Sequence, residues 1–224
     1  MRITNVHLVP LCSALLLLSW HPQSFAGAYF GVETSSNDTT LNFAGAQTEQ
    51  PLHFGIFVGA LSYEYESDRR PVEVKSTFVT PTVGYQWRGP ISYSLAVGAT
   101  WNEEEEQRGN RSDSSDDIGA VVQVGAAHWS ARNSVEWLAS YTDPTEFVWS
   151  RLRGKQRVAY VHDEVFMGAE LFWMGNDDFS SSGAGALVEA RGDVLSVLLK
   201  AGISDSKDSG SGAYGGVEFS VAFR

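Results

Sequence analysis

Residues Ile91–Trp101 read ISYSLAVGATW, and this stretch predicts the fold. Its apolar or aromatic side chains fall at every second position, and small or weakly polar ones lie between them. Successive side chains of a β-strand point to opposite faces, so the segment would have one apolar face and one face of small residues. A helix would spread the same residues around its circumference. The period of two therefore predicts a strand.

The same alternation recurs along the rest of the chain. We count twelve candidate strands, at Ala28–Thr34, Thr39–Ala46, Phe54–Glu66, Val72–Trp87, Ile91–Trp101, Ile118–Trp129, Val135–Tyr141, Phe147–Gly154, Val165–Trp173, Gly183–Ala190, Val194–Ser204 and Ala213–Phe223. The longest and most charged connection, Asn102–Asp117, falls at one end, and tight turns fall at the other. Outer-membrane barrels have short periplasmic turns and longer outer loops. The sequence thus predicts an all-β protein, an antiparallel up-and-down transmembrane β-barrel of about twelve strands.

Two segments are expected to depart from regular strands. Pro81 falls in the middle of the candidate strand Val72–Trp87, where it removes a hydrogen-bond donor from the ladder, so we expect a bulge there. Asn102–Asp117 carries seven acidic residues in irregular order, without the spacing or turn glycine of a calcium loop. We expect this connection to be a mobile, solvated surface loop.

The first 26 residues have the features of a cleaved signal peptide. Arg2 gives a positive start, Leu11–Ser19 forms a short apolar core, and Ser24-Phe25-Ala26 offers small residues at a cleavage site. The core is too short to span a bilayer comfortably. We expect residues 1–26 to be a signal peptide and residues 27–224 to form one outer-membrane barrel domain.

Composition narrows the function. The chain carries 27 Asp+Glu against 16 Lys+Arg, a formal net charge of −11, and its single cysteine is Cys12 in the signal peptide. This acidic balance argues against nucleic acid, which requires a basic face. The absence of cysteine after residue 26 leaves no thiolate ligand, and no metal or cofactor is expected. No later stretch approaches the ~18 consecutive apolar residues of a transmembrane helix, so only a closed barrel could cross a membrane.

Tryptophan placement supports a membrane-spanning wall. Indole prefers the membrane–water interface, where its apolar body and its N–H group are both accommodated. After the signal peptide, every tryptophan lies at or near the end of a candidate strand. We therefore expect an aromatic girdle in contact with outer-membrane lipid, formed by Trp87, Trp101, Trp129, Trp137, Trp149 and Trp173.

A set of charged residues is expected inside the barrel. These residues alternate with apolar neighbours, and an Arg or Lys facing lipid at mid-bilayer would cost about 2–4 kcal/mol. The expected lumen-facing residues are Glu136, Arg151, Arg153, Glu170, Glu189, Lys200 and Glu218. Two interpretations remain open: ion pairs that fill a narrow lumen, and a polar pathway for a small or polymeric solute.

One group of residues has the composition of a catalytic site. His128 and Ser130 are two apart on a strand and share a face, and Glu136 could orient the imidazole in an acid–base–nucleophile arrangement. The pattern resembles the His-x-Ser arrangement of outer-membrane lipid A 3-O-deacylases. However, the predicted topology places these residues by a periplasmic turn, and His128 shares its face with apolar residues. A rim histidine followed by turn residues explains the pattern more simply.

A family resemblance lies between Ser140 and Gly175. Tyr141–Pro144 reads YTDP, Phe147–Arg153 reads FVWSRLR, Phe166–Glu170 reads FMGAE, and Gly175 is followed by Asn. This order resembles the bacterial cellulose biosynthesis protein BcsS family. The resemblance implies an outer-membrane barrel that assists cellulose synthesis or export, and it carries no catalytic residues.

The predicted function is a non-enzymatic accessory to the biosynthesis or export of cellulose or another exopolysaccharide. The expected location is the outer membrane of a Gram-negative bacterium. Besides lipid, the expected partners are the cellulose-synthesis machinery or a polysaccharide. Two alternatives stay open: a lipid A deacylase-like enzyme using His128 and Ser130, and a small porin or surface-interaction barrel.

Overall fold

The computed structural model describes residues 26–36, 39–48, 51–67, 70–109, 111–143, 146–160, 164–176, 180–207 and 210–223. The expected signal peptide lies outside the described residues, except for Ala26, and stays a prediction. In the described part of the chain, no helix has the length and apolar character needed to cross a membrane.

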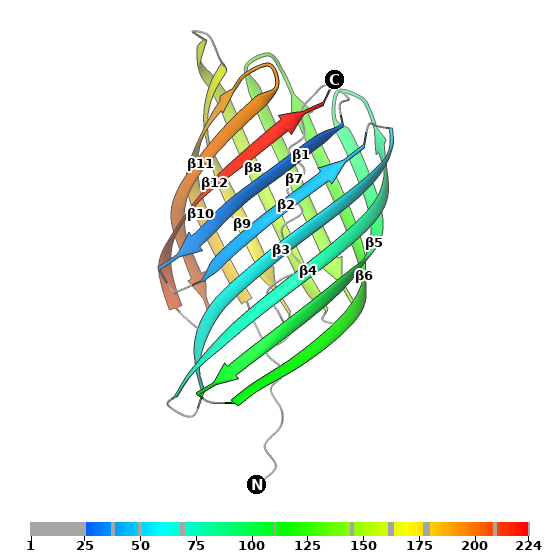
Figure 1. Cartoon of the computed structure of the whole chain (residues 1–224). Coiled ribbons are helices and arrows are strands. Elements are labelled where there is room, and N and C mark those ends of the chain that lie inside the picture. The colour runs from blue at the N-terminus through cyan, green and yellow to red at the C-terminus, as the bar shows by residue number, and fades with distance from the viewer. Residues whose placement is uncertain are drawn as a thin grey trace.

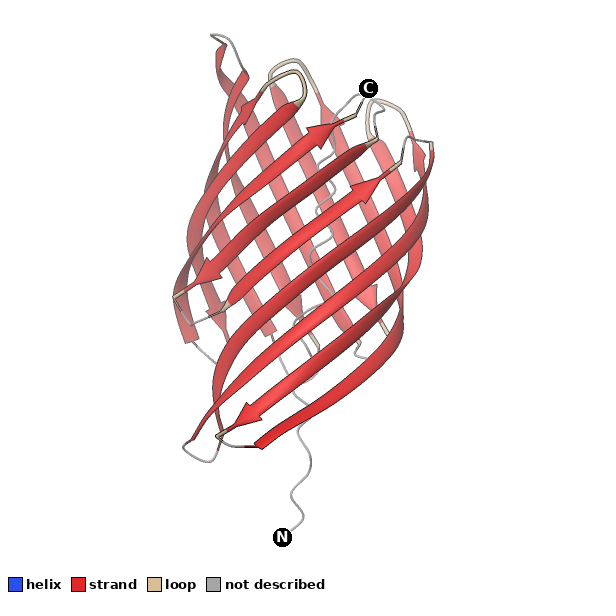
Figure 2. Cartoon of the chain, in the orientation of Figure 1, coloured by secondary structure: helices blue, strands red, loops and turns tan. Residues whose placement is uncertain are grey.

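All twelve predicted strands are present. They are β1 (Gly27–Ser35), β2 (Thr40–Gln47), β3 (Leu52–Ser67), β4 (Arg70–Trp87), β5 (Ser92–Arg108), β6 (Arg111–Trp129), β7 (Asn133–Thr142), β8 (Phe147–Tyr160), β9 (Glu164–Gly175), β10 (Ser180–Arg191), β11 (Leu195–Ser206) and β12 (Gly210–Ala222). Each strand pairs antiparallel with its neighbours in sequence, and β1 pairs with β12 to close the barrel (Figures 1 and 2). The predicted fold class is confirmed.

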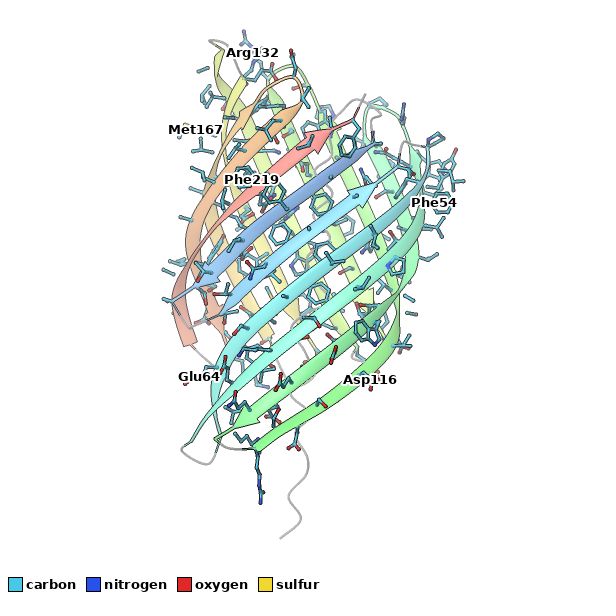
Figure 3. All side chains as sticks on the ribbon, in the orientation of Figure 1. Phe54, Glu64, Asp116, Arg132, Met167 and Phe219 are labelled. Carbon is cyan, nitrogen blue, oxygen red and sulfur yellow. The ribbon has the colours of Figure 1, made fainter. Side chains whose placement is uncertain are left out.

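The wall separates apolar side chains outside from polar and aromatic ones inside. Leu95 and Leu199 are 42% and 57% exposed, whereas Arg151 and Glu170 are 6% and 1% exposed. Figure 3 shows Phe54 and Met167 standing out from the wall. An apolar outer surface of this kind suits contact with lipid, and closure of the barrel lets the strands pair their backbone groups with one another.

The connection predicted as a loop, Asn102–Asp117, is a β-hairpin. β5 and β6 stay paired from Ser92 opposite Ala127 to Arg108 opposite Arg111, and Gly109 makes the turn with a positive φ of 61°. The loop prediction was wrong because this part of the hairpin lies outside the apolar belt. Its strands carry polar side chains on both faces, so they lack the period-two hydrophobicity that marks a membrane strand.

Four strands extend beyond the rest of the barrel. β2 pairs with β3 only as far as Ser62, and β7 pairs with β6 only from Val121, so the outer parts of β3–β6 form a projecting sheet (Figure 1). Gly27 pairs with Ala222 at the opposite end. Because outer-membrane barrels keep short turns on the periplasmic side and long connections outside, the projecting sheet is the extracellular end.

The bulge expected at Pro81 is absent. Val79 pairs with Trp101 and Thr82 pairs with Gly98, so the register of β4 on β5 is the same on both sides of the proline. The pairing of these strands skips only the two positions between Val79 and Thr82. Inside the barrel, the Thr80 hydroxyl donates to Thr100 Oγ1 at 2.9 Å. A register shift occurs instead in β8, between Arg157 and Ala159.

The inner face of β1–β4 carries a cluster of buried apolar side chains. We call this cluster of buried residues the aromatic wall; it consists of Tyr29, Leu41, Phe43, Phe57, Leu61, Tyr63, Val72, Val74 and Phe78. Its rings pack in series, with 5.5 Å between the centroids of Phe57 and Phe78. The tip of the Phe78 ring lies against Gly59 of the neighbouring strand, where an added Cβ would meet it at 2.2 Å. Glycine on the inner face thus makes room for a ring that fills the lumen.

Candidate functional site

The opposite side of the lumen is charged, and strand alternation explains why. In β8, Trp149, Arg151 and Arg153 are buried in the interior, while Ser150 and Leu152 face outward. Trp137 on the outside donates its indole N–H to Ser150 Oγ at 3.0 Å. One strand therefore builds the lipid-facing wall and the charged interior at the same time.

Arg153 lies at the centre of the charged interior. Its Nε donates to Glu170 Oε2 on the adjacent β9 at 2.8 Å. Its Nη1 and Nη2 donate to Glu218 Oε2 and Oε1 on β12, at 2.9 and 2.5 Å. β8 and β12 are not neighbours in the sheet, so this bidentate pair crosses the interior rather than following the wall.

Lys200 on β11 extends the same network. Its Nζ lies 2.6 Å from Glu33 Oε2, 3.2 Å from Glu218 Oε1 and 3.6 Å from Glu170 Oε1. Tyr214 donates its hydroxyl to Glu170 Oε1 at 3.0 Å. The two carboxylates are thus shared between Lys200 and Arg153, and the pairs hold β1, β8, β9, β11 and β12 together.

A second group of ion pairs surrounds Lys155 on β8. Its Nζ lies 2.8 Å from Glu136 Oε1 on β7 and 2.9 Å from Glu189 Oε2 on β10. Arg191 Nη2 donates to Glu189 Oε1 at 2.8 Å. The Trp129 ring covers this group, 5.3 Å from Lys155 Nζ and 5.4 Å from Arg191 Cζ. Cation–π contacts of this kind stabilise desolvated cations.

All seven residues expected in the lumen lie in this interior, together with four that sequence reasoning missed: Glu33, Lys155, Arg191 and Tyr214. Glu33 shares its face with Tyr29, so alternation within β1 could have identified it. Lys155 was missed because the predicted strand ended at Gly154, whereas β8 continues beyond its apolar part to Tyr160. The alternation of side chains along a strand could not predict which residues pair across the lumen, because that pairing depends on how the barrel closes.

Arg151 differs from the other cations of the lumen. It is buried, and its guanidinium lies 5.3 Å from the centroid of the Trp149 ring. Its Nη1 has no hydrogen-bond partner among the described residues. It lines a small hollow together with Tyr29, Phe43 and Leu198. In the described part of the chain, no group of three or more His, Cys, Asp or Glu side chains is arranged to hold a metal ion.

The expected tryptophan girdle is only partly present on the outer surface. Trp87, Trp101, Trp137 and Trp173 are exposed on the lipid-facing side. Trp149 and Trp129 were assigned to the girdle wrongly, because Trp149 is 2% exposed inside the barrel and Trp129 covers Lys155 and Arg191. Both indoles fall on the inward phase of their strands. Their position near a strand end therefore did not determine which side of the wall they face.

The catalytic arrangement suggested by His128, Ser130 and Glu136 is not assembled. His128 is exposed on the outer face, and its Nδ1 lies 2.7 Å from the Pro90 carbonyl oxygen. The Ser130 hydroxyl donates to the Asn133 carbonyl oxygen and accepts from the Asn133 N–H, which closes the turn. Glu136 points into the lumen and pairs with Lys155. Because the barrel wall separates Glu136 from His128, the carboxylate cannot orient the imidazole.

A closed, twelve-stranded barrel with an apolar outer surface and a charged interior defines the class, a bacterial outer-membrane β-barrel protein. The family follows from the sequence as a whole. The family model described as "Cellulose biosynthesis protein BcsS" matches residues 22–223, and the chain belongs to this family. The resemblance seen in Ser140–Gly175 is confirmed, as is the expected location in the outer membrane.

Solved structures show how common the fold is. The chain is similar to the transport unit of the autotransporter AIDA-I from Escherichia coli, with 12% identity, coverage of 93% of each chain and a TM-score of 0.58. The beta domain of the Bordetella autotransporter BrkA has 14% identity, 89% and 98% coverage and a TM-score of 0.56. The KdgM porin has 8% identity, 88% and 99% coverage and a TM-score of 0.52. At these identities the likeness concerns the fold alone. No curated protein matches the chain.

Proposed function

We propose that this BcsS-family barrel assists cellulose production without catalysis, as a closed scaffold for the synthesis machinery in the outer membrane rather than as an open conduit. The observation that carries the proposal is the pair between Arg153 and Glu218, which crosses the interior from β8 to β12. A strand-to-strand pair of this kind occupies the space that a solute would need.

The energetics of the interior support a closed resting state. Arg153, Lys155 and Lys200 are each paired with two or more carboxylates, and their side chains are almost completely buried. Separating a buried pair leaves a charge without compensation and costs about 3–5 kcal/mol. The aromatic wall fills the facing side of the lumen with packed rings. Opening a passage would require disruption of both.

A second candidate is a conduit for a polysaccharide. The hollow beside Arg151 and the fold shared with the KdgM porin favour it. A structure of that porin contains disordered oligogalacturonate. A conduit would require the pairs of Arg153 and Lys155 to exchange for contacts with the passing chain.

Two measurements decide between these functions. The gene is deleted and restored as wild type, and dye-binding cellulose is measured. Loss of cellulose on deletion and its return with the wild-type gene are expected, whereas unchanged cellulose would contradict the accessory role. The purified barrel is then placed in planar bilayers. The scaffold proposal expects no steady conductance, and a lasting open conductance of the wild-type protein would favour the conduit.

A further inference from the structure

The outer part of β6 is an open edge of the projecting sheet. β5 pairs with β6 from Arg111 to Ala127, but β7 pairs with it only from Val121, so Arg111–Gly119 has a paired strand on one side alone. In the described part of the chain, no strand pairs with its other side (Figure 1). All residues from Arg111 to Ile118 are exposed. An open edge of this kind is a template for an additional strand.

The hydrogen-bond pattern identifies the backbone groups on this edge. Asp143 donates its N–H to the Ala120 carbonyl oxygen at 2.9 Å, so the backbone of Ala120 points toward β7. Backbone groups alternate between the two sides of an antiparallel strand, and the register of β5 on β6 is unbroken. Every second residue before Ala120 therefore directs its N–H and C=O groups to the open edge: Ser112, Ser114, Asp116 and Ile118.

The side chains around the edge are acidic on both faces of the sheet. Alternation places Asp116 on the outer face and Asp113 on the inner face, and Figure 3 shows Asp116 on this part of β6. On β5, Glu103 lies directly opposite Asp116, and Glu106 lies opposite Asp113. Like charges directly opposite each other destabilise a sheet. Basic side chains on a strand added beside β6 would offset this repulsion, so charge complementarity selects a partner with lysine or arginine on both faces.

A second copy of this chain does not fit the edge. Antiparallel pairing of two β6 edges would bring Asp113 and Asp116 of one copy next to the same acidic side chains of the other. The opposite edge of the projecting sheet, on β3 beyond Ser62, carries Glu64, which lies opposite Glu73 on β4. Either contact between copies would bring like charges together, which destabilises strand pairing.

We propose that the open edge of β6 binds an extended, basic segment of another protein as a fifth strand of the projecting sheet. Backbone hydrogen bonds provide the affinity and the carboxylates select basic side chains, as in other complexes in which a peptide adds to a sheet edge. At about 3.3 Å per residue, Arg111–Gly119 offers an edge about 30 Å long. Because the projecting sheet is the extracellular end, the partner is a protein outside the outer membrane. The site lies outside the lumen and does not depend on the function proposed above.

The test uses the whole barrel purified in detergent and a fluorescent peptide of lysine, threonine and valine. The peptide matches the edge in length and carries lysines on both faces of its extended chain. A second peptide has the same sequence and charge but is N-methylated at every backbone nitrogen, so it has no donors. Fluorescence anisotropy is expected to show binding of the first peptide and at least tenfold weaker binding of the second. No binding of the first, or equal binding of both, overturns the proposal whether or not any variant folds.

A proline variant locates the binding. Ser114→Pro removes an N–H that points to the open edge, and an edge strand tolerates proline there because no ladder bond to β5 is lost. Peptide binding should weaken about tenfold or more, because a backbone hydrogen bond is lost. The matched control, Ser114→Ala, keeps the N–H and should bind as the wild type does. Equal affinities of the two variants would contradict the assignment, and a wild-type dimer that Ser114→Pro abolishes would identify a second copy as the occupant and overturn it.

Discussion

The aromatic wall of β1–β4 and the charged interior of β7–β12 face the same lumen but fill it in different ways. One side excludes water with packed rings, among them Phe57 and Phe78. The other side excludes it with ion pairs around Arg153 and Lys155. Both halves present the same apolar exterior to lipid.

This difference shows that the membrane constrains only one face of each strand. Lipid demands apolar side chains outside, and the alternation of the strand then leaves the inward positions free to vary. Packed rings need shape complementarity, so they are sensitive to added volume. Buried ion pairs need a matching charge, so they are sensitive to the loss of either partner. Substitutions on the two sides should therefore destabilise the barrel for different reasons.

The largest effect is expected at Arg153. Arg153→Met removes the bidentate partner of Glu218 and the Nε donor to Glu170, and it should lower the free energy of unfolding by about 3–5 kcal/mol. The measurement is the thermal unfolding midpoint of the barrel in detergent. Unfolding is detected by the difference in gel mobility between folded and unfolded protein. Arg132→Met, which removes an exposed arginine, is the control. An unchanged midpoint for Arg153→Met would show that the crossing pairs do not stabilise the barrel.

A smaller effect is expected from crowding the aromatic wall. Gly59→Ala places a Cβ 2.2 Å from the Phe78 ring, and overpacking of this kind costs about 1–3 kcal/mol. Gly154→Ala is the matched control, because a Cβ there meets nothing within 4 Å. The same unfolding assay compares the two variants. Equal midpoints would mean that the rings of this wall can rearrange.

Glu104 of the projecting β5–β6 hairpin is a carboxyl group whose surroundings favour its protonated form. Burial raises the pKa of Glu104 to about 7, and the nearby Glu106 adds to the shift. Because the folded-state pKa lies above the ordinary value, protonated Glu104 favours the folded hairpin. Stability should be greatest at pH below about 4.5 and should fall as the pH rises to about 7.

We expect this loss to be about 1 kcal/mol after allowance for solvent screening. Unfolding midpoints of the wild type at pH 5 and pH 8 are compared with those of Glu104→Gln, whose midpoint should change less between the two pH values. An identical pH dependence of the two proteins would assign the effect to other groups.

The smallest effect is expected at an exposed pair on the projecting sheet. Lys75 Nζ lies 2.9 Å from Glu73 Oε1, and both side chains are largely exposed. Lys75→Ala should leave the free energy of unfolding almost unchanged, because exposed pairs contribute little and salt screens them. Chemical unfolding at low and high salt measures it. A loss comparable to that of Arg153→Met would contradict the contrast between buried and exposed pairs.

Sequence reasoning found the strands wherever lipid imposed a pattern. It missed the outer half of the β5–β6 hairpin, where no lipid face exists and polar side chains cover both sides. It placed Trp129 and Trp149 at the correct ends of their strands but on the wrong side of the wall. It also identified interior charges such as Arg153 and Glu170. Their apolar neighbours along the strand face lipid, so these charges face inward.

By itself, the sequence determined a twelve-stranded barrel with lipid outside and charge inside, because alternation is a local property of the chain. Only the tertiary structure decided that Arg153 pairs with Glu218, that Arg151 is left with an unpaired Nη1, and that Tyr29 lines the same hollow. These contacts join strands far apart in sequence. They depend on the diameter and stagger of the closed barrel, which no single strand encodes.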